Sequence, residues 1–346
     1  MHQRGVDALL ASVGSDLPYL TGYEAMPLER LTMLVVTPAA ATLVVPELEA
    51  PRVIERGAFD VVPWGETEDP ISIVANLAGA ADRAAIGAQT WSVFLVRLQQ
   101  AMGSTRFTDA TEVMRSLRVI KDEAEIDLLR RAGTAVDAVV ERLRDTEFSG
   151  RTEAHLARDI MDMTVEEGHD VATFHIVASG PNAASPHHEP GERVIRNGDC
   201  VVVDFGGRVG GYCSDTTRTF HVGDPTPEYA EAYAALEAAQ AAGRAAAGPG
   251  VVAEEVDRVA RQVLIDSGHA EWFIHRLGHG IGLDGHEDPY LVEGNEEVLE
   301  PGMAFSIEPG IYKPGEWGMR IEDIVVCTPD GRESLNNSPR SLAIVE

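Results

Sequence analysis

The sequence predicts an α+β protein of two domains, a smaller α/β domain at 1–118 and a larger domain with internal pseudo-symmetry at 119–346. The first part alternates short strand-like runs with helical stretches, which is typical of α/β domains. The second part begins with a long amphipathic helical stretch and then repeats a pattern in which an apolar strand ends in a carboxylate. A chain of 346 residues is long enough for two domains with separate cores.

The composition narrows the class of protein. Hydrophobic residues make up 44% and charged residues 24% of the chain, as in an ordinary globular protein. The net charge of −28 argues against nucleic acid or an anionic membrane surface as a partner, because both attract clustered Lys and Arg. Three cysteines indicate a reducing compartment rather than a disulfide framework. Since no secretory signal and no run of about 18 apolar residues occurs, we expect a cytoplasmic protein and no membrane span.

The first domain has signals for both strands and helices. Runs of β-forming residues predict strands at 31–36, 42–45 and 60–62. Helical stretches are predicted at 50–56, 71–81 and 91–102. After His2 this domain contains no histidine and no cluster of catalytic side chains. We expect it to shape access to a site in the second domain or to form a subunit interface.

Helices in the second domain are predicted at 123–143, at 153–167, from Thr226 onward and at 253–267. The first has apolar residues at helical spacing. The second has Thr152 as an N-cap and Gly168 as a stop signal. The third begins with the cap Thr226 followed by Pro227 at the first helical position, and Gly268 closes the fourth.

Residues 200–220 carry two acids on a predicted β-hairpin. Strand-forming residues lead to Asp204, glycines reverse the chain, and a second strand-like run carries Asp215. An acid at the end of an apolar run is costly to bury unless its charge is compensated. Two acids on adjoining strands can meet at one point, where a divalent cation offsets their repulsion. Taken alone, an Asp-Gly region of this kind is more often a surface hairpin.

An internal repeat places another acid in a similar position. The spacing Val194-x3-Gly198-x5-Asp204-x-Gly206 recurs as Val298-x3-Gly302-x5-Glu308-x-Gly310. Each copy follows a pair of predicted helices and puts a carboxylate at the end of an apolar strand. Two similar halves that face each other would bring these acids to one centre, and a chance match over so few positions is the alternative.

Two further side chains complete a candidate metal site. His279 lies among glycines that allow close backbone approach, and Glu322 lies within a predicted apolar strand. Singly, His279 could be a core histidine and Glu322 a charge on a strand face. With Asp204, Asp215 and Glu308 they have the composition of a two-metal site, where carboxylates offset the repulsion between two cations. One nitrogen, many oxygens and no thiolate favour Mn²⁺, Co²⁺ or Fe²⁺ over a structural zinc site.

These five residues and their motifs resemble the pita-bread metallopeptidases, the family of methionine aminopeptidase, Xaa-Pro aminopeptidase and Xaa-Pro dipeptidase (prolidase). The resemblance covers about 120–346 and rests on VVVDFGG, SDTTRTF, GHGIGLDGHE, SIEPGIY, RIEDIV and the helical stretch LRVIKDEAEIDLLRRA. It implies a pita-bread catalytic domain preceded by a creatinase-like N-terminal domain. That N-terminal domain favours the proline-specific branch, since methionine aminopeptidases usually lack it. The complete ligand set argues against the creatine hydrolases and histone-chaperone relatives.

The resemblance also implies two divalent metal ions per subunit, with Mn²⁺ favoured and Co²⁺, Fe²⁺ or Zn²⁺ as alternatives. In this scheme Asp204 chelates one ion, Asp215 and Glu322 bridge both, and His279 and Glu308 complete one coordination sphere. A hydroxide between the ions attacks the scissile carbonyl. Glu308 accepts its proton and passes it to the leaving nitrogen.

Further roles follow from the same resemblance. His187 falls where the family has a substrate-contacting histidine, and His286 falls where another histidine steadies the tetrahedral oxyanion. The neighbouring His188 is expected to have no role. Arg320 and Tyr212 are candidates for holding the bridging carboxylates, with plain structural roles as the alternative.

The resemblance predicts hydrolysis of the bond before proline in a small peptide with proline in second position. A dipeptidase is favoured, and an aminopeptidase acting on longer peptides is the alternative. A dipeptidase needs a cation for the free carboxylate of its substrate, best supplied by Arg. Familiar prolidases place that arginine in the segment that is 286–300 here, which has no Arg or Lys and only Tyr290 as a large polar side chain. Arg30 in a homodimer, the usual family assembly, is a candidate anchor, with a surface role as the alternative.

Two other classes of function remain to be compared with the peptidase. A catalytically silent peptide-binding module is disfavoured because all five ligands and both histidines are present. A two-metal phosphoesterase is disfavoured because Arg and Lys are scarce around the motifs, where phosphate would need them.

Overall fold

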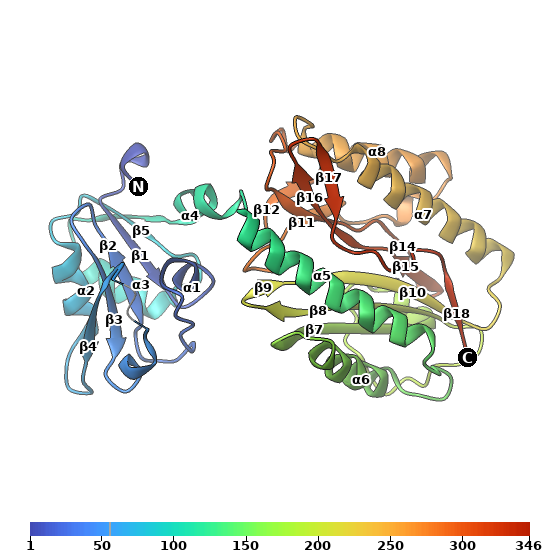
Figure 1. The fold of residues 1–346 in the computed structure, drawn as a ribbon, viewed down its shortest axis with the longest axis horizontal. Helices are drawn as coiled ribbons and strands as arrows, with labels where there is room; N and C mark the ends of the chain where they lie inside the picture. The colour runs from blue at the N-terminus through green and yellow to red at the C-terminus, as the bar shows by residue number, and fades with distance from the viewer. Residues whose placement is uncertain (55–56) are drawn as a thin grey trace. The chain divides into compact units, whose positions relative to one another are not determined.

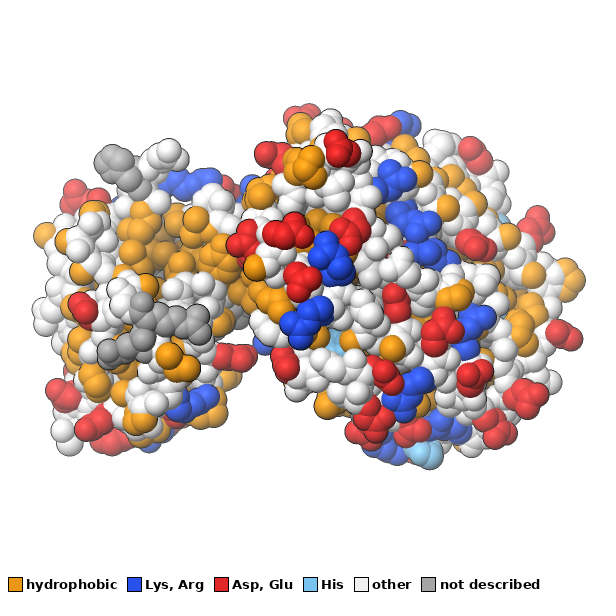
Figure 2. Space-filling view, viewed as in Figure 1, with side chains coloured by type: hydrophobic (Ala, Val, Ile, Leu, Met, Phe, Trp, Pro, Cys, Tyr) orange, Lys and Arg blue, Asp and Glu red, His pale blue; other side chains and the backbone are white. Residues whose placement is uncertain are grey.

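The computed structural model describes residues 1–54 and 57–346, which form two compact units, Met1–Arg118 and Val119–Glu346 (Figure 1). Each unit has its own sheets and its own hydrophobic core. Within the described ranges, no helix combines the length and apolar character needed to cross a membrane. On the face seen in Figure 2, Asp and Glu are spread over both units and interspersed with Lys and Arg. The negative charge of the chain is therefore not confined to one patch of that face.

The N-terminal unit is a six-stranded mixed sheet in the order β4-β3-β2-β1-β5-β6. Its strands are β1 (Ala8–Ser12), β2 (Met33–Val36), β3 (Ala41–Pro46), β4 (Asp60–Trp64), β5 (Arg83–Ile86) and β6 (Arg106–Asp109), and its helices are α1 (Asp16–Thr21), α2 (Pro70–Ala78), α3 (Ser92–Ala101) and α4 (Thr111–Arg118). Successive residues of a strand point to opposite faces. Met33 packs with residues of α2 and α3, whereas Leu34 packs with Leu17 of α1. Both faces of this sheet are therefore covered.

Most predicted elements of this unit are confirmed with shifted ends, namely strands β2, β3 and β4 and helices α2 and α3. The helix predicted at 50–56 is wrong over its first part, because only a 3₁₀ turn at Ala50–Arg52 forms and Val53 is already extended. The run between Pro51 and Gly57 is too short to offset the cost of starting an α-helix. Residues 55–56 of that prediction lie outside the described residues. Strands β1 and β5, both containing alanine, gave no clear strand signal in the sequence.

The C-terminal unit contains two five-stranded sheets and a two-stranded ribbon, with orders β18-β10-β8-β7 (β9 pairs β8), β12-β11-β13-β16-β17 and β14-β15. The strands are β7 (Val171–Ser179), β8 (Cys200–Val209), β9 (Tyr212–Cys213), β10 (Thr216–Val222), β11 (Gly278–Gly280), β12 (Glu287–Leu291), β13 (Ala304–Ile307), β14 (Gly310–Lys313), β15 (Trp317–Arg320), β16 (Asp323–Thr328), β17 (Gly331–Ser334) and β18 (Ala343–Val345). The helices are α5 (Glu123–Arg144), α6 (Glu153–Glu166), α7 (Pro227–Ala246) and α8 (Ala253–Asp266). All helices predicted for this part of the chain are thus confirmed.

The predicted capping signals are present in two of these helices. Thr152 caps α6 by accepting a hydrogen bond from the backbone N–H of His155. Thr226 caps α7 by accepting from the N–H of Tyr229, and Pro227 occupies the first turn. Such side-chain caps satisfy backbone donors that the helix itself leaves unpaired, and they fix where each helix begins.

The repeat in the sequence corresponds to two structurally similar halves. Thr152, which precedes α6, forms an isolated antiparallel bridge with Val194. Val252, which precedes α8, forms the equivalent bridge with Val298. In each half, the residue before the second helix is therefore bridged to the segment that precedes the strand leading to the acid.

The two halves also match in the segments that lead to Asp204 and to Glu308. Gly198 and Gly302 have φ values of 91° and 92°, in a region that favours glycine. Strand β8, which contains Asp204, begins two residues after Gly198, and β13, which ends just before Glu308, begins two residues after Gly302. The internal pseudo-symmetry expected from the sequence is therefore present in the fold.

Each half has a helix pair packed on its own sheet. Val136 of α5 and Leu156 of α6 pack with Val203 of β8. Leu236 of α7 packs with Phe305 of β13 in the other cluster, to which α8 also contributes. In Figure 1 the strands of this unit lie between α6 on one side and the α7–α8 pair on the other.

Candidate metal centre

The β8–β10 hairpin brings the first two predicted ligands together. Strands β8 and β10 are antiparallel, with Asp204 opposite Thr217. Asp215 lies in the connection between β9 and β10. The two aspartates are only 7% and 6% exposed. The predicted hairpin is confirmed, but the positions of its two acids are corrected: Asp204 lies within β8, which continues to Val209, and Asp215 lies just before β10 rather than on it. Both acids are buried rather than lying in surface turns.

His279 is held in β11, a short strand between β12 and β13. The glycines on either side make this position possible. A Cβ at Gly278 would lie 2.0 Å from the carbonyl oxygen of Ser306, and one at Gly280 would lie 2.1 Å from the carbonyl oxygen of Asp288. Any larger residue would force the strands apart. The imidazole itself is buried, with 2% of the residue exposed.

The two glutamates come from strand ends in the second half. Glu308 directly follows β13. Glu322 was predicted to lie inside an apolar strand, and this is wrong: it lies in the two-residue gap between β15 and β16. Its backbone N–H donates to the carbonyl oxygen of Thr217 at 3.1 Å. The break arises because β15 pairs with β14 whereas β16 pairs with β13, so the chain changes sheets at this acid.

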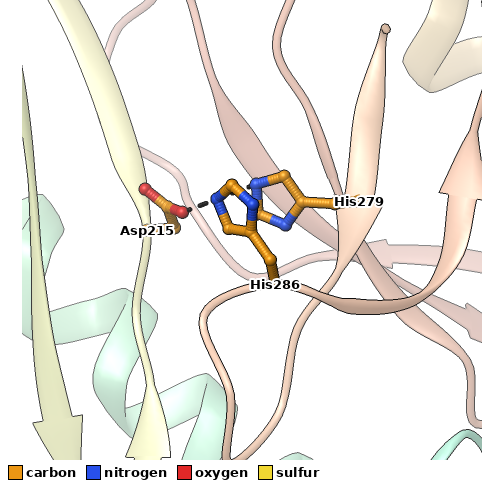
Figure 3. A group of neighbouring side chains, drawn as sticks. All are labelled: Asp215, His279 and His286. Atoms are coloured by element: carbon orange, nitrogen blue, oxygen red, sulfur yellow. Dashed lines mark ion pairs between the residues drawn. The ribbon is translucent and has the colours of Figure 1, made fainter. Parts of the chain in front are cut away.

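All five predicted ligands line one cavity of about 680 Å³. Three overlapping groups have ligand atoms within 4.8 Å of one another, namely Asp204–Asp215–Glu322, His279–Glu308–Glu322 and Asp215–His279–His286. Figure 3 shows the last group, in which Asp215 and two stacked imidazoles converge from different strands and loops. The Nε2 atom of His279 lies 3.7 Å from Asp215 Oδ2 and 3.2 Å from Glu308 Oε1.

The cavity holds more negative charge than its protein surroundings balance. Burial raises the pKa of Asp215 well above its usual range, and the charges of Glu322, Asp204 and Glu308 raise it further. Burial and the nearby charges of Glu308 and Asp204 do the same to Glu322. Clustered carboxylates cannot all be ionised without nearby positive charge. Divalent cations would supply that charge.

Two observations test whether the residues fit metal ions. The Oδ1 atom of Asp204 is buried, and no hydrogen bond reaches it from the described residues. A buried, unpaired oxygen is costly unless it has a partner such as a cation. The Nδ1 atom of His279 lies 3.1 Å from the carbonyl oxygen of Gly280 and therefore donates to it, which leaves Nε2 as the ligand atom. The acidic and histidine groups fit a dinuclear site for divalent metal ions.

A buried network holds the carboxylates in place. Arg320, predicted as a supporting residue, donates to Asp204 Oδ2 and, through Nε, to the hydroxyl of Thr217 at 3.0 Å. The same hydroxyl donates to Glu322 Oε2 at 2.8 Å. Arg320 also donates to the hydroxyl of Tyr312 at 2.7 Å. One guanidinium therefore orients two of the candidate ligands, one directly and one through Thr217.

We expect Thr217→Val to weaken metal binding about 10–100-fold, which is the usual effect of losing a group that orients a ligand. Valine has the same shape but leaves Glu322 Oε2 and Arg320 Nε without their shared partner. The affinity would be measured by calorimetric titration of the metal-free protein with Mn²⁺. Thr217→Ser keeps the hydroxyl and should stay close to the original chain. If both variants bound Mn²⁺ equally well, the hydroxyl would have no orienting role.

The two predicted catalytic histidines line the same cavity. His286 stacks on His279, with ring centroids 3.7 Å apart. Burial lowers the pKa of His286 to about 4, and the neighbouring His279 ring contributes to this shift. His187 is exposed at the cavity wall. Its neighbour His188, for which no role was expected, lies 2.8 Å from a carboxylate oxygen of the fully buried Glu153 and so anchors the loop that carries His187.

The remaining predicted site residues are not among those that line the cavity. The hydroxyl of Tyr212 donates to Glu125 of α5, which joins β9 to that helix. Tyr290 lies in β12 and packs against Arg276. Arg30, in the N-terminal unit, pairs with Glu29 at 2.7 Å and Glu66 at 3.0 Å. None of these contacts involves one of the five candidate ligands.

Sequence reasoning missed Arg276, Thr217 and Tyr312 as residues of the site. Arg276 lines the cavity, and Tyr312 bonds Arg320 from β14. Thr217 could have been found, because it is two residues after Asp215 on a predicted strand and so points to the same side. No local signal marks Arg276 or Tyr312, since their positions depend on pairing between distant strands.

Comparison with known proteins agrees with this geometry. Residues 127–329 match Metallopeptidase family M24, and residues 1–120 match the Creatinase/Prolidase N-terminal domain. The chain is 48% identical to a probable dipeptidase PepE of Mycobacterium tuberculosis, with 99% of this chain and 92% of that protein covered. It is 35% identical to an Xaa-Pro dipeptidase of Lactobacillus delbrueckii subsp. lactis, with coverage of 100% and 96%.

A solved structure extends the likeness to the whole fold. The prolidase from Thermococcus sibiricus superposes with a TM-score of 0.94 at 37% identity, over 99% of this chain and 95% of that one. The likeness includes both units and the pita-bread fold of the C-terminal one. Given the family match over more than half of its length and relatives above 30% identity across nearly all of it, this chain belongs to metallopeptidase family M24 and carries a creatinase/prolidase N-terminal domain.

Proposed function

We propose that this chain is an Xaa-Pro dipeptidase that binds two divalent metal ions through Asp204, Asp215, His279, Glu308 and Glu322. The observation that carries the proposal is a single cavity that holds these five side chains together with His187 and His286. The relatives that are named Xaa-Pro dipeptidase and prolidase support it. Mn²⁺ is the proposed metal, because oxygen donors with one imidazole suit it better than they suit zinc in a structural site.

Two divalent cations at this site would lower the pKa of water and polarise the scissile carbonyl. Glu308 is placed to move the proton. Its Oε1 accepts from the Ser306 hydroxyl at 3.0 Å and lies 3.2 Å from His279 Nε2. The described residues form no hydrogen bond with its Oε2, which is the atom we assign to accept the proton from the attacking water and deliver it to the proline nitrogen.

His286 is placed to stabilise the developing oxyanion. Arg276 Nη2 lies 3.3 Å from His286 Nδ1. A guanidinium only donates hydrogen bonds, so Nδ1 accepts and the ring proton is on Nε2. That N–H can donate to the carbonyl oxygen as its negative charge grows.

His187 is assigned to contact the substrate, and its loop is well supported for that purpose. Glu153 accepts from the backbone N–H and hydroxyl of Ser179, from Asn182 and from His188. A fully satisfied buried carboxylate of this kind makes the surrounding loop rigid. The bond to proline nitrogen has no N–H, so recognition must come from contacts with the ring and with the ends of the peptide.

The test is hydrolysis of Ala-Pro beside Ala-Pro-Ala, a longer Xaa-Pro peptide and Ala-Ala, with Mn²⁺ and then with EDTA. We expect cleavage of Ala-Pro alone, lost with the chelator and restored by excess Mn²⁺. Cleavage of the longer peptides would instead indicate an aminopeptidase, and cleavage of Ala-Ala would remove the specificity for proline. Failure on every peptide in the presence of metal would overturn the mechanism.

For assembly and location, we propose a cytoplasmic homodimer in which the domain at 1–118 contributes contacts or shapes access to the domain at 119–346. Support for the contacts comes from Trp91, Val93 and Val96 at helix α3, which are 40%, 52% and 49% exposed. Clustered apolar side chains on a surface mark association sites. The cysteines Cys200, Cys213 and Cys327 are all buried free thiols, in keeping with a reducing compartment.

A further inference from the structure

If the proposed function holds, the cavity must accept a free carboxylate. In an Xaa-Pro dipeptide the α-carboxylate is on the residue directly after the scissile bond, and an extended residue spans only about 3.5 Å. The carboxylate therefore enters the same acidic cavity as the reacting carbonyl. Its charge has to be met there by a cation, because a desolvated and unpaired carboxylate is strongly unfavourable.

The cavity offers two cationic side chains among its described lining residues, Arg276 and Arg320. Arg320 is 3% exposed, and Asp204, Thr217 and Tyr312 already occupy its guanidinium. Its donors are therefore used to hold the carboxylates of the protein. A substrate carboxylate would have to displace Asp204 to reach it.

The guanidinium of Arg276, unlike that of Arg320, still has donors for a ligand. The Arg276 side chain is partly exposed at the cavity, and the described residues place no carboxylate at ion-pair distance from it. Its Nη2 atom lies 3.3 Å from His286 Nδ1, and its Cζ atom lies 4.3 Å from the centroid of the Tyr290 ring. A guanidinium has five N–H donors, so most of them remain for a ligand.

The backbone beneath Arg276 is held firmly. The N–H of Leu277 donates to Asp257 Oδ1 at 2.9 Å, and Arg261 donates to the carbonyl oxygen of His275 at 2.8 Å. Leu277 is fully buried. Arg276 therefore projects from a fixed segment, and stacking on Tyr290 restricts its planar group further.

We propose that Arg276 binds the α-carboxylate of the dipeptide and is thus the residue that makes this site a dipeptidase. The planar fork of arginine matches a carboxylate with two parallel hydrogen bonds. Arg276 contacts His286, which is assigned to the oxyanion. The oxyanion and the α-carboxylate are one residue apart in the substrate, so the side chains that bind them have to be neighbours. Tyr290, the large polar side chain of the segment 286–300, supports the anchor rather than replacing it.

The experiment compares Ala-Pro with Ala-Pro-amide, which lacks the charged carboxylate, in the Mn²⁺-loaded chain and in Arg276→Gln and Arg276→Lys. We expect the glutamine variant to lose about 10–100-fold in kcat/KM on Ala-Pro, mainly through KM, as for loss of a charged hydrogen-bond pair. On Ala-Pro-amide the loss should be clearly smaller than on Ala-Pro, because the amide lacks the charged carboxylate and only the contact of Arg276 with His286 is disturbed. The lysine variant should recover part of the loss on Ala-Pro, because it restores the charge but not the fork.

A binding measurement separates the anchor from catalysis. The reduced-bond analogue of Ala-Pro, titrated calorimetrically into the metal-free protein, should bind about tenfold more weakly to Arg276→Gln, and its amide should bind both proteins equally. Equal losses on acid and amide would mean that Arg276 acts through His286, and no loss on either would also overturn the proposal. If the unmodified chain cleaves no Xaa-Pro peptide, the proposed function fails instead, so the two failures are distinguishable.

Discussion

Asp215→Asn is expected to lower kcat/KM on Ala-Pro by at least about 10³-fold and to reduce the bound metal below two ions per chain. Asp215 belongs to two of the three groups of candidate ligands, with Asp204 and Glu322 in one and with His279 and His286 in the other. Asparagine keeps its size but loses the charge. Metal content would be measured by elemental analysis after dialysis, in parallel with the kinetics.

In the metal-free protein, the same variant is expected to be more stable than the original chain. The pKa of Asp215 is raised by burial and by neighbouring carboxylates, so the ionised residue is unfavourable without metal and its removal should raise the melting temperature. The Mn²⁺-dependent rise in that temperature should shrink, because ligand-linked stabilisation follows affinity. Asp266→Asn, at an exposed site in α8, is the matched control and should change neither. Retention of two ions and full activity by Asp215→Asn would contradict the ligand assignment.

The largest effect on stability is expected from Arg218→Met, at about 3–5 kcal/mol of unfolding free energy, because it breaks one side of a buried ion pair. Arg218 is 3% exposed and pairs with the fully buried Asp323 at 2.8 Å. It also donates to the carbonyl oxygen of Glu322 at 2.6 Å and to the hydroxyl of Ser338 at 2.8 Å. Methionine fills similar space but removes all of these hydrogen bonds, so that among the described side chains Asp323 keeps only Arg340 and Gln240 as partners and its Oδ1 atom loses its ion pair.

Urea unfolding of the metal-free protein would measure this loss. Arg258→Met is the control, since Arg258 forms an exposed pair with Glu255 on the surface of α8, and such pairs contribute little. Arg218→Met should also weaken Mn²⁺ binding, because Arg218 holds the backbone at Glu322. Equal unfolding midpoints for the two variants would show that the buried network contributes no more than a surface pair.

The sequence predicted most of the candidate site because its signals are local. Asp204 and Glu308 are marked by the repeat, and Asp215 and His279 by glycine-rich segments around them. All of them line the cavity. Each signal depends only on strand-forming runs and on glycines that permit a turn or a close approach, and a short window of sequence contains both.

What could not be predicted depends on pairing between distant segments. Arg276 meets Tyr290 only because β11 pairs with β12, and the strand around Glu322 is broken because β15 and β16 have different partners. The first part of the helix expected at 50–56 is wrong for a different reason, since the short run after Pro51 does not offset the cost of starting an α-helix and Val53 is already extended. Propensity and periodicity carry no information about such partners.

The repeated halves make the two proposed metal ions chemically unequal. The group His279–Glu308–Glu322 comes entirely from the second half and contains a nitrogen, whereas Asp204–Asp215–Glu322 mixes both halves and contains only oxygens. The first group therefore suits a softer cation and exists within one half of the domain. The second group offers hard donors alone and exists only where both halves are docked. Binding of an ion to the all-oxygen group would therefore require both halves, and two different divalent ions would be expected to divide so that the softer one is held by the group with His279.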